Sequence, residues 1–285
     1  MQASDLYRQL DRDFEIEQIV DEWSFLPRNE YMSPSFSAPH YAGLVLDNAQ
    51  QINKVYTAVF PNTALLERIL SGGETDALLF CHHAMGYDGN LEGFPFYEIP
   101  RDLLARMKEQ RIAFYMLHAA LDRNGPYSTS VSLAGALGLQ VERPFCEYDG
   151  IQVGVICKTI YKTGSALAEH VRAVVGHEVK RYAYGQDAIS DGLVAVAAGG
   201  GSYPFVAREL VALGVKHYIT GVTRPMPSFE PTMEFHQIMR ENGISLIGAT
   251  HESTEQYACR AMVRYFEECG VPAEFLAEKP CLNDL

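Results

Sequence analysis

The stretch DALLFCHH, residues 76–83, is an apolar run that ends in two histidines. A short apolar run bounded by turn signals is typical of a strand buried on both faces, and Gly72-Gly73 and a glycine-containing loop flank this one. Residues 99–110 then have helical character, and a second apolar run occupies residues 112–118. This alternation of strand and helix predicts an α/β fold with parallel strands.

The same alternation continues towards both ends of the chain. Residues 4–23 have the spacing of one or two amphipathic helices, and residues 25–40 are predicted to be irregular. Asn62 is expected to cap the helix that follows it. Further strands are predicted at 41–46, 52–60, 151–157, 193–198, 216–220 and 244–249, and further helices at 61–71, 165–175, 203–213, 231–242 and 254–268.

Composition excludes several classes of protein. The chain has 285 residues, with 23 basic and 36 acidic side chains, a net charge of −13. This acidic balance argues against a nucleic-acid partner, which would require a basic surface. No apolar stretch is long enough to span a membrane, and the charged N-terminus lacks the apolar core of a signal peptide. We therefore expect a cytoplasmic protein without a membrane partner, whose six scattered cysteines are reduced.

His82 and His83 form the first candidate site. Adjacent side chains on a regular strand point to opposite faces. The two imidazoles can therefore converge only if the strand ends here and the backbone turns into the following loop. A structural or surface role for the pair remains an alternative.

His118 and Asp122 form the second candidate site, again at the end of an apolar strand. Because sites in parallel α/β sheets gather at the carboxyl ends of strands, these residues are predicted to share a site with the histidine pair. Alternatively, Asp122 merely caps a turn with Asn124 and Gly125.

His251 and Glu255 follow a third apolar run. If Ser253 or Thr254 opens the next helix, Glu255 lies in its first turn, where the helix dipole favours a carboxylate without any metal. Three strand ends that each offer histidine or a carboxylate nevertheless predict a site for one or two divalent ions. Zinc, manganese, iron and nickel all accept these ligands.

Two weaker signals lie in the last third of the chain. Residues 199–202, Gly-Gly-Gly-Ser, can hold an anion or form a tight turn, and the turn is favoured because the sequence matches neither a dinucleotide-binding fingerprint nor a P-loop. His217, Tyr218 and Thr220 are interpreted as lying at the end of another strand, where they could line the same site. The nucleophile motif G-x-S-x-G does not occur.

These motifs together resemble the NIF3-like family, also described as type 2 GTP cyclohydrolase I. The resemblance runs from about Leu44 to Phe275. It rests on His82-His83, on His118-x-x-x-Asp122, on GGGSYPFVARELVALGVKHYITG at 199–221 and, most specifically, on ISLIGATHESTE at 244–255. It implies an α/β fold of two similar lobes with mixed or parallel sheets, and a dinuclear metal site in the cleft between the lobes. It also implies a homohexamer, a toroidal trimer of dimers.

Carried onto this chain, the resemblance implies a single NIF3-like unit over residues 1–285. Its first lobe comprises about 1–140 with the C-terminal segment, and its second about 141–250. One departure is that the family's Asp-x-Gly-Leu segment is replaced by His40-Tyr41-Ala42-Gly43-Leu44, which lacks the acidic residue. The resemblance implies that His118 is either a further ligand or a residue that contacts the ligands without binding the ions. The implied ligands of the two divalent ions are His82, His83, Asp122, His251 and Glu255.

Two functions follow from the resemblance. The first is a metal-dependent hydrolase of the GTP cyclohydrolase type, acting on a nucleotide or a related small molecule through a metal-activated water. The second is a non-catalytic or regulatory metal-binding scaffold. An open coordination position with bound water would favour the first function, and a closed ligand shell the second.

Overall fold

The computed structural model describes residues 1–22, 28–36, 41–91 and 93–285. His40 and part of the expected irregular segment lie outside these ranges. The chain divides into two compact units. Unit 1 comprises Met1–Asp88, Pro95–Leu121 and Cys259–Glu278, and unit 2 comprises Gly89–Phe94, Asp122–Ala258 and Lys279–Leu285. Two helices contain a boundary between the units, α4 (Ala119–Asp122) and α9 (His251–Glu268).

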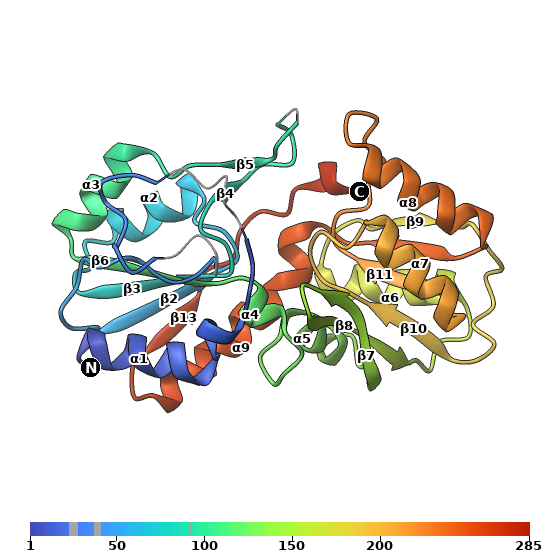
Figure 1. The fold of residues 1–285 in the computed structure, drawn as a ribbon, viewed down its shortest axis with the longest axis horizontal. Coiled ribbons are helices and arrows are strands. Elements are labelled where there is room, and N and C mark those ends of the chain that lie inside the picture. The colour runs from blue at the N-terminus through green and yellow to red at the C-terminus, as the bar shows by residue number, and fades with distance from the viewer. Residues whose placement is uncertain (23–27, 37–40, 92) are drawn as a thin grey trace. The chain divides into compact units, whose positions relative to one another are not determined.

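Unit 1 contains a five-stranded sheet with the order β1-β6-β3-β2-β13 (Figure 1). The three buried strands β2, β3 and β6 and the short β13 run parallel, while β1 at one edge is antiparallel to β6. Every residue of β3 and β6 is buried, which explains their continuous apolar sequences. The strands are β1 (Ala42–Leu46), β2 (Lys54–Ala58), β3 (Ala77–Cys81), β6 (Ile112–Leu117) and β13 (Ala273–Phe275).

Helices cover both faces of this sheet. On one face, α2 (Thr63–Ser71) and α3 (Arg101–Glu109) pack their leucines against the strands. On the other face, α1 (Ala3–Asp13) stacks Tyr7 on Tyr115 of β6, and the C-terminal part of α9 sets Phe266 against Phe80 of β3. Unit 1 also holds the 3₁₀ turn η1 (Ile16–Gln18) and a two-stranded hairpin of β4 (Gly86–Tyr87) and β5 (Phe96–Tyr97).

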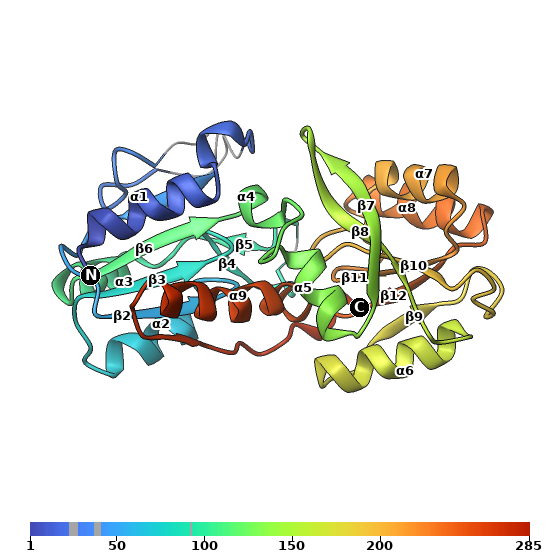
Figure 2. The ribbon, with the colours of Figure 1, turned by 90° about the horizontal axis from the view of Figure 1, so that it is seen from below.

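Unit 2 contains a six-stranded mixed sheet with the order β7-β8-β10-β11-β12-β9 (Figure 2). Its central strands β10, β11 and β12 are parallel, and the antiparallel β8 and β9 flank them. The strands are β7 (Gln140–Tyr148), β8 (Ile151–Lys158), β9 (Lys180–Tyr182), β10 (Leu193–Val196), β11 (His217–Thr220) and β12 (Ser245–Gly248).

This second sheet is also covered on both faces. Helices α5 (Thr129–Ala136) and α6 (Gly164–Val175) pack on one face, where Leu133 and Leu167 join the core. Helices α7 (Pro204–Leu213) and α8 (Glu230–Glu241) pack on the other, where Leu210 and Phe235 are fully buried. A short 3₁₀ turn, η2 (Leu282–Asp284), follows. Both units are thus three-layer α/β structures.

The predicted α/β class with mixed and parallel sheets is confirmed, and the predicted strands and helices are all present with shifted ends. Asn62 precedes α2 as expected, but its side chain does not cap the helix. Its amide oxygen instead accepts a 2.7 Å hydrogen bond from the Tyr87 amide, and its nitrogen donates to Glu278. The sequence did not predict α4, α5, β7, β9, β13 or the β4–β5 hairpin. Asp122, expected at the end of a strand, is the last residue of α4.

No helix among the described residues is long and apolar enough to cross a membrane. All six cysteines carry free thiols, as predicted, and four of them are buried. Burial raises the pKa of Cys81 and Cys157, so these thiols are held in the protonated form.

Candidate metal centre

His82 and His118 follow neighbouring parallel strands of unit 1. In the register of β3 and β6, Cys81 lies opposite Met116, so the residues after each strand come out at the same edge of the sheet. The amides of His82 and His83 still donate to the carbonyls of Ala58 and Val59, at 3.3 and 3.0 Å. The parallel pairing therefore holds the backbone of both histidines while their side chains leave the sheet.

The three imidazoles of unit 1 form one cluster. Ring centroids lie 4.5 Å apart for His82 and His83, 5.0 Å for His82 and His118, and 4.9 Å for His83 and His118. One nitrogen from each ring can be chosen so that all three lie within 4.8 Å of one another. His82 and His83 are 0% and 1% exposed, which excludes the surface alternative for this pair.

The tautomer of His82 is set by a backbone carbonyl. Its Nδ1 lies 2.7 Å from the oxygen of Leu117, so Nδ1 carries the proton and donates it. The lone pair is therefore on Nε2, the form in which imidazole binds a metal. His83 is held differently, because its ring stacks on Phe60 with centroids 4.6 Å apart.

Unit 2 supplies the pair His251 and Glu255 at the start of α9. The helix begins at His251, three residues earlier than predicted. Thr250 precedes it with a φ of +59°, and its hydroxyl accepts a hydrogen bond from the Ser253 amide, as an N-cap does. The carboxylate of Asp284 accepts a second bond, from the His251 amide, at 2.9 Å.

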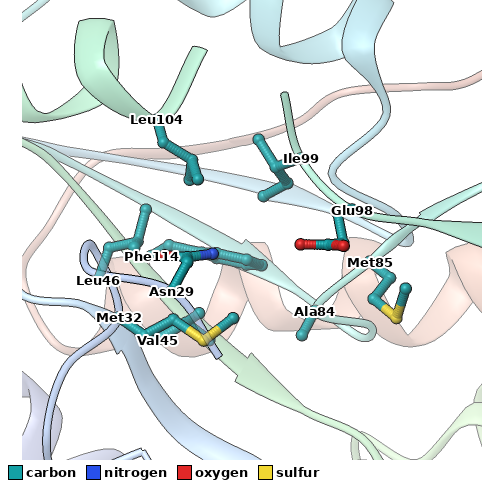
Figure 3. Close-up of a pocket in the computed structure, with 10 residues that line it drawn as sticks. All are labelled: Asn29, Met32, Val45, Leu46, Ala84, Met85, Glu98, Ile99, Leu104 and Phe114. Carbon is teal, nitrogen blue, oxygen red and sulfur yellow. The ribbon is translucent and has the colours of Figure 1, made fainter. Parts of the chain in front are cut away.

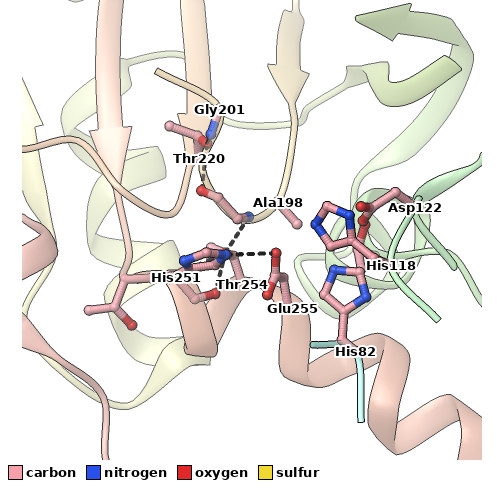
Figure 4. Close-up of polar contacts among 12 residues, drawn as sticks. His82, His118, Asp122, Ala198, Gly201, Thr220, His251, Thr254 and Glu255 are labelled. Atoms are coloured by element: carbon pink, nitrogen blue, oxygen red, sulfur yellow. Dashed lines mark hydrogen bonds and ion pairs between the residues drawn. The ribbon is translucent and has the colours of Figure 1, made fainter. Parts of the chain in front are cut away.

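Because the helix begins at His251, Glu255 lies one full turn further on. The interpretation of Glu255 as a first-turn carboxylate, placed there by the helix dipole, is therefore wrong. The i, i+4 spacing instead brings Nε2 of His251 to 3.1 Å from Oε1 of Glu255 (Figure 4), and both side chains are buried. A buried imidazole and carboxylate in contact are a donor set suited to a divalent ion.

The glycine run 199–201 forms a bend between β10 and α7, where the sequence favoured a tight turn. The Gly199 amide donates to the hydroxyl of Thr254, and the Gly201 amide donates to the hydroxyl of Thr220. These amides are engaged within the protein, so they do not form an anion cradle. A Cβ on Gly199 would lie 2.1 Å from Oε1 of Glu255, which shows how closely the turn packs on this carboxylate.

Asp122 is the last residue of α4 and belongs to unit 2. Its Oδ1 accepts a 2.5 Å hydrogen bond from the hydroxyl of Thr129 at the start of α5. The neighbouring Asn124 donates from its backbone amide to the carbonyl of Gln152 and from its side-chain amide to the carbonyl of Gly154. The turn at Asn124 is thus tied to β8, and Thr129 orients the carboxylate of Asp122.

His217 does not belong with these residues, and its interpretation as lying at the end of a strand is wrong. β11 begins at His217, so this side chain is at the amino end of the parallel strands. Its Nε2 lies 3.3 Å from the carbonyl of Ala188, and burial lowers its pKa. Tyr218 and Thr220 of the same strand donate to the carbonyls of Gly201 and Gly199, so they support the glycine turn.

A small pocket in unit 1 lies beside residues 84 and 85, directly after the histidine pair (Figure 3). Its walls are mainly apolar, and Asn29 and Glu98 contribute polar groups. The space open to the centre of a water molecule is about 20 Å³, room for about one water. A nucleotide would need a site more than ten times larger, so this pocket is not a substrate site.

Sequence reasoning missed Asp21. Its carboxylate is 0% exposed, and Oδ2 lies 2.6 Å from Nδ1 of His118 and 3.2 Å from the amide of Ala119. The contact joins residues 97 positions apart, and the surrounding Ile19-Val20-Asp21-Glu22 has no motif that would have indicated it.

Comparison with known proteins identifies the family. A sequence profile of Duf34/NIF3 (NGG1p interacting factor 3) matches residues 30–280. The chain belongs to the Duf34/NIF3 family. The matched residues include both histidines of the pair and the whole of α9, whereas Asp21 precedes them.

Relatives and solved structures agree with this assignment. A GTP cyclohydrolase 1 type 2 homolog of Pyrococcus horikoshii is 29% identical over 278 residues, covering 94% of this chain and 98% of the relative. The structure of protein ybgI, described as of unknown function, aligns with a TM-score of 0.75 and 21% identity over 98% of this chain and all of its own. TTHA1606 from Thermus thermophilus aligns with a TM-score of 0.67, also at 21% identity, over 99% of this chain and all of its own. At these identities the structures show the shared fold.

Proposed function

We propose that this protein is a hydrolase that depends on two divalent metal ions and acts on a nucleotide or a related small molecule. The ligands would be His82, His83, Asp122, His251 and Glu255. The names of the curated relatives support a purine nucleotide such as GTP as the substrate class.

The observation that carries the proposal is the 2.7 Å contact between Nδ1 of His82 and the carbonyl oxygen of Leu117, from which the tautomer follows. A buried histidine whose Nδ1 donates to a carbonyl keeps its Nε2 lone pair for a metal, and the adjoining rings of His83 and His118 offer further nitrogens. In unit 2, the carboxylate of Glu255 beside His251 supplies an anionic ligand. Imidazole and carboxylate are donors that zinc, manganese, iron and nickel accept, so the residues fit such ions.

Divalent ions in such a site lower the pKa of bound water and polarise substrate oxygens. The chain's own residues have separate tasks. The imidazoles bind without adding charge, whereas Asp122 and Glu255 offset the positive charge of the ions. Burial of His82, His83 and Glu255 keeps bulk water from competing for the ions.

The test is to load the purified protein with zinc, manganese, iron or nickel and incubate it with GTP and other nucleotides. Ring opening is followed by ultraviolet absorbance, and phosphate release is measured in parallel. We expect turnover that requires metal and is absent from Glu255→Gln. A protein that binds two ions but turns over none of the nucleotides would favour the scaffold function instead.

We also propose that the chain forms a homohexamer in the cytoplasm, with no nucleic-acid partner. The family membership supports the assembly, and the net charge of −13 supports the absence of nucleic acid. Light scattering at micromolar concentration should give six times the chain mass of 31.8 kDa. A particle of 31.8 kDa would reject the hexamer.

A further inference from the structure

The buried carboxylate of Asp21 pairs with the partly buried imidazole of His118. Oδ2 of Asp21 lies 2.6 Å from Nδ1 of His118, and the same oxygen accepts the Ala119 amide at 3.2 Å. Tyr41 packs edge-on against the His118 ring, with centroids 5.4 Å apart. One face and one nitrogen of the ring are thereby fixed, and all of these residues belong to unit 1.

This contact sets the chemistry of His118. A carboxylate at Nδ1 accepts a proton, so Nδ1 is protonated and the lone pair is on Nε2. Histidines that bind metals usually donate their other ring N–H to a carboxylate or a carbonyl, which orients the ring and increases its basicity. His82 has this arrangement with the carbonyl of Leu117, and His118 has it with the carboxylate of Asp21.

We propose that Asp21 is a positioning residue that makes His118 the third imidazole ligand of unit 1. The ring centroid of His118 lies 5.0 and 4.9 Å from those of His82 and His83, and one nitrogen of each ring can be chosen so that all three lie within 4.8 Å of one another. Since His82 and His83 are expected to bind different ions, His118 would join one of them as a second imidazole. The inference rests on the proposed metal-dependent function.

Asp21 precedes residues 30–280, the range matched by the family profile. Tyr41, which contacts the His118 ring, belongs to the segment where the resemblance implies an acidic residue. The carboxylate beside His118 thus comes from an upstream segment.

The first test measures the tautomer. In the metal-free full chain labelled with ¹⁵N-histidine, magnetic resonance should show His118 protonated on Nδ1 in the wild type. Asp21→Asn, whose amide can donate to Nδ1, should move this proton to Nε2. A wild-type His118 protonated on Nε2 overturns the inference, whether or not the variant folds.

The second test measures metal affinity by zinc titration against a competing chelator. Asp21→Asn should weaken binding by about 10–100-fold, and Asp21→Glu should restore part of the loss. The control is Asp11→Asn, because Asp11 is also a carboxylate of the N-terminal segment that accepts a 2.6 Å hydrogen bond from a β6 residue, the hydroxyl of Tyr115. It should bind zinc as the wild type does.

Affinity of Asp21→Asn within twofold of the wild type would overturn the inference, as would an equal loss in Asp11→Asn. If Asp21→Asn does not fold, Asp21→Glu and His118→Gln take its place, and both must bind zinc more weakly than the wild type. A wild type that binds no metal contradicts the proposed function instead, while the tautomer measurement still decides the role of Asp21.

Discussion

The two units present their ligand groups in different ways. In unit 1 the proposed ligands are imidazoles that follow adjacent parallel strands, and hydrogen bonds to Leu117 and Asp21 orient two of them. In unit 2 the pair on α9 is brought together by the helical repeat and by the glycine turn that packs against it. In unit 1 the orientation of the imidazole rings thus depends on hydrogen-bond acceptors. In unit 2 the position of the Glu255 carboxylate depends on close packing against the glycine run.

This difference separates two kinds of substitution. Changing an acceptor in unit 1 should alter which nitrogen faces the metal and leave the packing intact. Adding volume in unit 2 should move a ligand directly. The predictions below test this contrast, beginning with the largest expected effect.

Glu255→Gln should lower occupancy at both metal sites. Two divalent ions about 3.5–4 Å apart repel each other unless an anion lies between them, and a carboxylate has two oxygens with which to bridge. Asp122→Asn should mainly empty one site, since this carboxylate comes from α4 and not from α9. The measurement is metal stoichiometry per chain, with folding checked by circular dichroism. A well-folded Glu255→Gln that retains two ions would exclude the bridge.

His82→Ala and His83→Ala should each lose part of the bound metal while the chain stays folded. We expect the two histidines to bind different ions, because neighbouring side chains diverge as they leave a strand, and their rings are inclined by 71°. Mass spectrometry of the metal content tests this. The matched control is His170→Ala, since the His170 ring contacts Tyr161 and the carbonyl of Leu137. Unchanged metal content in both variants would mean that the ions bind elsewhere.

Gly199→Ala should weaken metal binding and lower the free energy of unfolding by about 1–2 kcal/mol. The stability loss follows from the φ of +72° at this residue, which an L side chain adopts at a cost. The new methyl would also collide with Oε1 of Glu255, and this flexible carboxylate would have to move away.

Gly200→Ala is the control for this glycine, because a Cβ there meets no atom within 4 Å. Urea unfolding and zinc titration of both variants make the comparison. If the two variants bind zinc with equal affinity, close packing on Glu255 does not position the carboxylate.

The smallest effect concerns pH. Burial lowers the pKa of His236 from its ordinary value of 6.5, and the nearby Arg240 lowers it further, while the Thr223 carbonyl opposes this shift. The folded chain therefore binds fewer protons at His236 than the unfolded chain does, so stability is full above about pH 6.5 and falls as the solution is acidified.

His236→Gln should reduce this dependence, provided that it folds. The comparison is the free energy of unfolding at about pH 8 and about pH 5.5, on either side of the ordinary histidine pKa, for the wild type and the variant, both free of metal. A variant that loses as much stability on acidification as the wild type would remove His236 as a cause.

The ends of the strands that lead to the site could be predicted from the sequence. The apolar runs before His82 and His118 predicted buried parallel strands, and the common carboxyl edge of such strands brings these residues together. β7 gave no such signal because its first five residues are exposed, and β13 has only three residues, paired with a strand more than 200 positions away.

The backbone conformation at the start of α9 and the long-range polar contacts could not be predicted from the sequence. The start of α9 at His251 depends on Thr250 at a positive φ, which is uncommon for a β-branched residue, and no pattern marks it. No sequence pattern marks the contact of Asp21 with His118 either. Both features orient proposed ligands, so the sequence indicated which residues form the groups but not what holds them in place.

The most direct test of the account is a crystal structure of the metal-loaded protein with anomalous scattering recorded at the metal edge. The account predicts two ions per chain, with His82, His83, Asp122, His251 and Glu255 among their ligands and an open position on at least one ion. Peaks located away from these five residues, or no anomalous peak after metal loading, would contradict it.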